Sequence, residues 1–91
     1  MALMLLGFKL DDYDEWKQVF DSDPGGRRGV ATGHRISRSV EDPNEIYVAV
    51  EYASAEDAKS VLERLQAAGV LDRYSRTLGP TITEIVEETK Y

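Results

Sequence analysis

Hydrophobic positions along the chain follow two different periods, which alternate in a regular order. In four segments, apolar residues recur at every second position or run continuously, which is typical of β-strands: 2–10, 31–40, 46–52 and 81–88. At 12–22 and 54–68 they recur every three to four positions, which is typical of a helix with one buried face. A shorter helical period at 70–78 predicts an additional short helix before the last strand. In chain order the main segments predict strand, helix, strand, strand, helix, strand.

That order is the split βαβ arrangement of ferredoxin-like domains. We therefore predict an α+β fold, βαββαβ, in which two helices cover one face of a four-stranded antiparallel sheet. A chain of 91 residues has no room for a second hydrophobic core, so we expect one domain over 1–91.

Polar residues at the predicted helix ends support the two main helices. Asp12 is expected to be the N-cap of the first helix, with Glu15 three residues later. Ser54 and Asp57 stand in the same relation at the start of the second helix, and Gly69 follows its last apolar position. Both helices therefore have start signals, and the second also has a stop signal.

The turn at 41–45 joins the second and third strands into a predicted hairpin. Placing Val40 opposite Ile46 keeps the branched apolar residues together on one face, and it sets His34 opposite Tyr52. A register shifted by one residue would instead bring this histidine beside a glutamate. We prefer the first register.

The first strand is apolar on both of its faces, which is unusual for an antiparallel strand with one side in water. Met4 and Leu6 alternate with Leu3 and Leu5. Two helices cover only one face of the sheet, so the second face needs another partner. A second copy of the chain supplies it most simply, and we predict a homodimer.

Composition excludes several kinds of partner and site. The net charge of −6 argues against a nucleic-acid surface and against binding to anionic membranes. The absence of cysteine removes disulfides, thiolate metal ligands and cysteine nucleophiles. The apolar N-terminal run is too short to span a membrane and lacks a positive leading segment and a cleavage site, so we expect a cytoplasmic protein.

The candidate pocket residues are aromatic side chains and the only histidine. Trp16 and Phe20 on the first helix, with His34 and Tyr52 on the hairpin, are expected to form walls of a small-molecule pocket between sheet and helix. His34 is the candidate acid–base residue, since its unperturbed pKa lies near neutrality. The alternative is structural: the aromatic residues form the core, and the histidine lies at the dimer contact. One histidine cannot build a metal site alone, and we expect none.

Four arginines form the only basic concentration in this acidic chain: Arg27, Arg28, Arg35 and Arg38. These arginines are suited to orient an anionic substrate through paired hydrogen bonds, and we assign substrate binding to Arg35 and Arg38, on the same predicted strand as His34. The alternative is charge balance against the many carboxylates. The nearby glycines lack the spacing and the Lys-Ser/Thr ending of a phosphate-binding loop, and we interpret them as a flexible loop at the mouth of the pocket.

Several segments resemble those of the dimeric α+β barrel superfamily, which includes antibiotic-biosynthesis-monooxygenase-like, muconolactone-isomerase-like and cyclase-like proteins. They are Tyr13-Asp14-Glu15-Trp16-Lys17, Phe20-Asp21, Gly33-His34-Arg35-Ile36-Ser37-Arg38-Ser39, Glu41-Asp42-Pro43-Asn44-Glu45 and Ala55-Glu56-Asp57-Ala58. The resemblance implies a dimer whose two sheets face each other, with a ligand between each sheet and its helices. Relatives bind polyketide-like quinols, lactones or haem, but no helix here carries the histidine with which haem-degrading relatives ligate iron.

We therefore expect a small hydrophobic or aromatic ligand, no cofactor, and one of two reaction classes. His34 would remove a proton from an acidic aromatic or enol-type carbon, while Arg35 or Arg38 stabilises the resulting anion. Reaction with oxygen would make the protein a cofactor-independent monooxygenase, and reprotonation would make it a cyclase or isomerase. The alternatives are a non-catalytic ligand-binding or sensing module and a purely structural homodimer.

Overall fold

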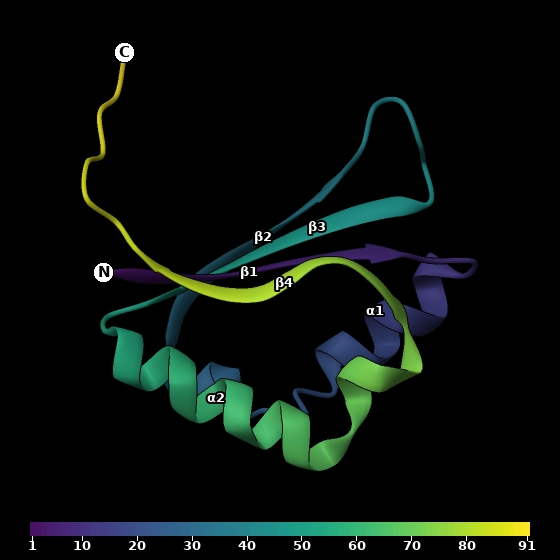
Figure 1. Ribbon diagram of the computed structural model, residues 1–91, viewed down its shortest axis with the longest axis horizontal. Coiled ribbons are helices and arrows are strands. Elements are labelled where there is room, and N and C mark those ends of the chain that lie inside the picture. The colour runs from purple at the N-terminus through teal and green to yellow at the C-terminus, as the bar shows by residue number, and fades with distance from the viewer.

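The four strands form one antiparallel sheet, and both helices lie on the same side of it (Figure 1). The computed structural model describes residues 1–91. The strand order across the sheet is β2-β3-β1-β4. The elements in chain order are β1 (Ala2–Lys9), α1 (Tyr13–Asp21), the 3₁₀ turn η1 (Arg27–Gly29), β2 (Ala31–Arg38), β3 (Glu45–Tyr52), α2 (Ala55–Ala68), the 3₁₀ turn η2 (Val70–Arg73) and β4 (Ser75–Glu84). The predicted ferredoxin-like α+β fold is confirmed.

The predicted helix ends are also confirmed. The Asp12 carboxylate accepts a hydrogen bond from the Glu15 backbone N–H at 3.1 Å, which caps α1. The Ser54 hydroxyl accepts one from the Asp57 N–H at 3.2 Å, which caps α2. Gly69 ends α2 with φ = 72°, a left-handed conformation that glycine adopts without steric cost.

The predicted pairing of His34 with Tyr52 is wrong, because the hairpin register differs by two residues. His34 lies opposite Val50, and Ile46 lies opposite Arg38. A shift of two residues preserves the alternation of side chains, whereas a shift of one would invert it. His34 therefore stays on the side of the sheet that faces the helices, but in a different neighbourhood.

The reason for this register lies in the loop between β2 and β3. The Ser39 hydroxyl accepts hydrogen bonds from the backbone N–H groups of Glu41 and Asp42, each at 3.2 Å. The Asp42 carboxylate in turn forms an ion pair with Lys9 at the end of β1. These bonds close the loop at Ser39, so Val40 leaves the ladder and is fully exposed.

The prediction for the last strand is wrong at both ends. The short helix predicted in 70–78 is present as η2, but only over Val70–Arg73. β4 begins at Ser75, inside that segment, and it does not match the predicted bounds 81–88. Gly7 of β1 makes this early pairing sterically feasible: a Cβ at this position would lie 2.6 Å from Oγ1 of Thr77. Pairing with the free edge of β1 therefore overrides the local helical period.

The two faces of β1 differ in burial as the alternation predicts. Met4 and Leu6 point toward the helices and are almost fully buried, whereas Leu3 and Leu5 remain partly accessible on the opposite face. No helix lies on that face, and the segment after β4 extends away from the sheet on the same side (Figure 1). Neither α1 nor α2 has the length and apolar character needed to cross a membrane.

Candidate functional site

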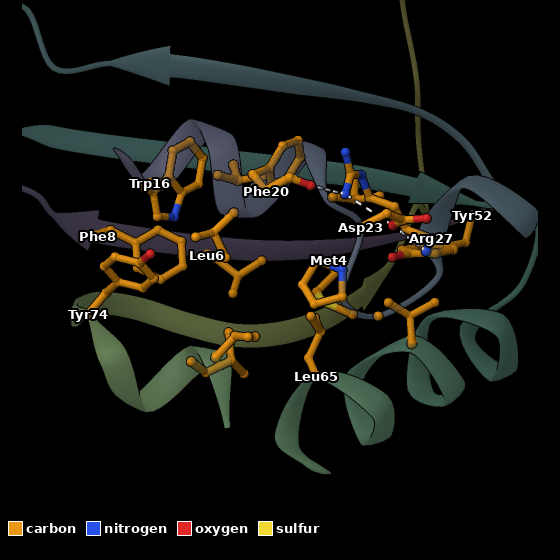
Figure 2. A pocket seen from close by; sticks show the side chains of 18 residues that line it. Met4, Leu6, Phe8, Trp16, Phe20, Asp23, Arg27, Tyr52, Leu65 and Tyr74 are labelled. Atoms are coloured by element: carbon orange, nitrogen blue, oxygen red, sulfur yellow. Dashed lines mark hydrogen bonds and ion pairs between the residues drawn. The ribbon is translucent and has the colours of Figure 1, made fainter. Parts of the chain in front are cut away.

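A cavity lies between the sheet and the two helices (Figure 2). Its volume is about 70 Å³, and 14 of its 18 lining residues are hydrophobic. An apolar cavity of about 150 Å³ holds one benzene molecule. A ligand of one or more rings therefore enters only if a lining side chain moves.

One end of the cavity is a wall of aromatic rings. Trp16 of α1 stacks on Phe20, with ring centres 5.3 Å apart and planes inclined by 24°. The ring of Phe8 on β1 lies 5.6 Å from Trp16 and contacts Tyr74 edge to face at 6.1 Å. Such pairs favour offset or edge-on geometry, so they fix one another's orientation. These rings form an apolar wall at one end of the cavity, against which an aromatic ligand can pack.

The other end of the cavity is polar and holds Arg27, Asp23 and Tyr52 (Figure 2). Nη1 of Arg27 donates hydrogen bonds to the Phe20 carbonyl oxygen at 2.7 Å and to Oδ1 of Asp23 at 3.2 Å. The guanidinium carbon lies 3.7 Å from the centre of the Phe20 ring. Arg27 is only 7% exposed, so the cavity has one buried positive charge at this end.

The loop after α1 determines the position of Arg27. Asp23 has φ = 59°, and its carboxylate accepts hydrogen bonds from the backbone N–H groups of Arg27 at 2.8 Å and Arg28 at 3.3 Å. Nε of Arg64 on α2 donates to the Gly25 carbonyl at 2.8 Å. The loop is thus tied to both helices, and it holds the guanidinium in place.

Burial perturbs the ionisable groups of the cavity. It lowers the pKa of Arg27, and the neighbouring Asp23 carboxylate opposes part of this change. It raises the pKa of Tyr52 to about 12. The pKa of Tyr74 is also raised, by burial and then by the Glu15 carboxylate to which its hydroxyl donates. Both tyrosines are therefore neutral at ordinary pH and can donate hydrogen bonds.

The structure divides the predicted site residues into two groups. Trp16, Phe20 and Tyr52 line the cavity. His34, Arg35 and Arg38 do not.

The three residues outside the cavity have separate surroundings. His34 is exposed and contacts Phe20 edge to face, with ring centres 5.1 Å apart. Arg35 lies opposite Ala49 and lines hollows of the helix-free face with Leu5 and Leu3.

Arg38 lies near the start of α1, where its guanidinium carbon is 5.1 Å from the centre of the Tyr13 ring. The structure therefore does not bring Arg38 together with the histidine, whereas Arg35 and His34 line one surface hollow outside the cavity.

The arginine that does line the cavity, Arg27, was not among the predicted site residues. The sequence does carry a signal for it: Asp23 precedes Arg27 by four residues across Pro24, Gly25 and Gly26. A carboxylate at this spacing, in a loop that turns back on itself, can hold both the backbone and the side chain of the arginine. Interpreting these glycines only as a flexible loop obscured the signal.

A second hollow lies on the surface beside the cavity, and we call it the basin. Its volume is about 300 Å³, and it is lined by Lys17, Asp21, Arg27, Arg28, Ala31, Thr32, Gly33 and His34. Arg27 is common to the cavity and the basin. Lys17 forms an ion pair with Asp21 at 2.6 Å. No group of three or more histidine, aspartate or glutamate side chains in the structure is arranged to hold a metal ion.

Solved structures of several proteins share this fold. A point mutant of SnoaB, a cofactor-independent oxygenase from Streptomyces nogalater, matches with a TM-score of 0.72 and 14% identity, over 96% of this chain and 94% of that one. A putative antibiotic biosynthesis monooxygenase from Deinococcus radiodurans matches with a TM-score of 0.65 and 11% identity, over 100% and 98% of the two chains. A dimeric ferredoxin-like protein from an uncultured marine organism matches with a TM-score of 0.64 and 17% identity, over the full length of both chains.

These likenesses show that the chain shares its fold with these proteins. No model of a known protein family matches the chain. No curated protein matches it in sequence.

Proposed function

We propose that this protein binds a small aromatic or enol-type molecule in the cavity and oxidises it with molecular oxygen, without a cofactor. The cavity itself is the observation that supports this proposal: it is apolar, closed by stacked aromatic rings at one end and by a buried arginine at the other. The shared fold with a cofactor-independent oxygenase agrees with it.

The chemistry requires an acidic carbon and a cavity from which water is excluded. Loss of a proton from a CH₂ group beside an aromatic or carbonyl system gives a carbanion that transfers electrons to O₂. The hydroperoxide that forms then loses water, so that R₂CH₂ and O₂ become R₂C=O and H₂O. Apolar walls exclude competing water, and a nearby positive charge stabilises the anion. The lining of the cavity meets both requirements.

His34 remains our candidate for the base, and its position sets a condition on that role. The imidazole contacts Phe20, and Phe20 lines the cavity, whereas His34 lines the basin. Phe20 is only half-buried, and the cavity is smaller than a single aromatic ring requires. We propose that ligand entry displaces the Phe20 ring, which joins the cavity to the basin and brings the reacting carbon within reach of His34.

We further propose that the active form is a homodimer associated through the helix-free face of the sheet. Leu3 and Leu5 form the apolar centre of this face, with Tyr47 and Ala49 of β3 beside them. One of the structurally similar proteins is a dimeric ferredoxin-like protein. In such a dimer Arg35 would lie at the subunit contact.

Ligand binding and turnover can be tested separately. Trp16 is the only tryptophan and lines the cavity, so its fluorescence reports occupancy directly. We would add a panel of quinols, anthrone-type ketones and enol lactones, and follow oxygen uptake with an electrode in the same samples. Oxygen uptake with formation of the ketone supports the proposal. Binding without uptake or other turnover would indicate a ligand-binding or sensing module instead, and reprotonated products without uptake would indicate an isomerase or cyclase.

A matched pair of variants on α2 tests whether the Trp16 fluorescence change and the oxygen uptake depend on the cavity. Leu65→Phe adds bulk to a lining residue, whereas Leu62→Phe adds the same bulk three residues away, outside the lining. We expect Leu65→Phe to weaken binding at least about tenfold and Leu62→Phe to leave it nearly unchanged. Equal effects of the two variants would argue against the cavity as the site.

A further inference from the structure

The polar end of the cavity holds donors that no protein group uses. A guanidinium has five N–H donors. The two on Nη1 of Arg27 donate to the Phe20 carbonyl oxygen and to Oδ1 of Asp23. The structure contains no hydrogen bond from Nε or Nη2 of Arg27. No buried side-chain nitrogen or oxygen in the protein lacks a partner. The unbonded Nε and Nη2 of Arg27 therefore reach open space in the hollows that this residue lines.

The unused edge of Arg27 has a specific shape. Nε and Nη2 project two parallel N–H groups, which match the two oxygens of a carboxylate. Arg27 therefore offers a paired donor edge to one anionic group at this end of the cavity (Figure 2).

Local charge also favours an anion here. Arg27, Arg28 and Lys17 surround the basin, against a single carboxylate there, Asp21, and Asp23 in the adjoining cavity. Arg28 has no ion-pair partner. This positive region stands out in a chain whose net charge is −6. The rest of the cavity is apolar, so a ligand that uses both features must be amphipathic.

We propose that Arg27 forms a carboxylate-binding subsite, and that the natural ligand is a hydrophobic monocarboxylic acid with its apolar body in the cavity. This inference rests on the proposed use of the cavity for ligand binding, but it does not depend on the reaction. It assigns ligand selection to a residue that is distinct from the candidate base.

The test compares two probes that differ only in charge, octanoate and octanamide, by titration of Trp16 fluorescence in the full-length protein. We expect octanoate to bind at least about tenfold more tightly, since hydrogen bonds to a charged group contribute more than neutral ones. In the ¹H–¹⁵N spectrum, the Nε–H signal of Arg27 should shift with octanoate and not with octanamide. Equal affinities, or an unmoved Nε–H signal, would overturn the carboxylate subsite while leaving the cavity as a binding site. If neither probe binds, this inference fails, whereas the proposed function is decided separately by the panel of quinols, anthrone-type ketones and enol lactones.

Variants distinguish the effect of the paired N–H donors of Arg27 from the effect of its positive charge. Arg27→Lys keeps the positive charge but removes the paired donors, and we expect it to lose most of the preference for octanoate. Arg28→Gln is the matched control, because it removes a neighbouring exposed charge and should change the preference less than about threefold. A preference that survives Arg27→Lys would overturn the assignment.

Discussion

His34 and Phe20 meet edge to face, with ring centres 5.1 Å apart and planes at 73°. Phe20 also lines the cavity, whereas His34 does not. The only histidine is thus in contact with the cavity through a phenylalanine side chain. Any role of His34 as a base therefore depends on the position of that ring.

The first prediction concerns His34→Ala. We expect ligand affinity to change by less than about twofold, because the imidazole does not line the cavity. Turnover should fall by about 10²-fold or more, the usual contribution of a general base. Trp16 fluorescence and oxygen uptake measure the two effects. Arg38→Gln, on the same strand and also exposed, is the control and should keep full turnover; full turnover in His34→Ala would remove the histidine from the mechanism.

The second prediction concerns the helix-free face of the sheet. Leu5→Asp places a charge without a partner at the centre of the proposed dimer contact, which costs several kcal/mol in a dry interface. We expect a monomer, or an insoluble chain, where the wild type is a dimer. Multi-angle light scattering at micromolar concentration gives the mass directly. Val40→Asp, at a fully exposed apolar position, should remain dimeric; a wild-type protein that stays monomeric at high concentration contradicts the dimer.

The third prediction concerns alkaline pH and Tyr52. The unfolded chain begins to release the phenolic proton near pH 10, whereas the folded protein holds it until about pH 12. The stabilisation is therefore complete below pH 10 and is lost as the pH rises through 12, by about 1–3 kcal/mol. Urea unfolding across this range should show a smaller fall in Tyr52→Phe than in the wild type. The control is Tyr91→Phe, at an exposed residue near the C-terminus, which should behave as the wild type does.

The fourth prediction concerns the packing of the loop that carries Arg27. A Cβ at Gly25 would lie 2.8 Å from Cγ of Leu65 and 3.0 Å from Cγ1 of Val61, both of which line the cavity. Gly25→Ala should therefore cost about 1–3 kcal/mol of unfolding free energy and also weaken ligand binding. Gly33→Ala, where a Cβ would meet nothing within 4 Å, should be neutral or slightly stabilising. Equal urea midpoints for the two variants would show that the loop is not packed as described.

The sequence alone predicts those features of the fold that depend on neighbours close in the chain. Asp12 and Ser54 cap helices because each side chain reaches a backbone N–H three residues later. Leu3 and Met4 fall on opposite faces of β1 because the period of a strand is two. Trp16 and Phe20 lie together on α1 for the same local reason, with a period of 3.6. These features identify the fold and the aromatic wall of the cavity.

Tertiary structure decides whatever depends on contacts between distant segments. The hairpin register depends on the hydroxyl of Ser39 and on an ion pair between Asp42 and Lys9 of another strand. β4 begins early because the free edge of β1, open at Gly7, pairs with the extended segment that follows η2. The position of His34 follows from the register, and the burial of Arg27 follows from its loop being tied to both helices. The local pattern of apolar residues does not predict such contacts, because they contribute free energy only once the distant segments have come together.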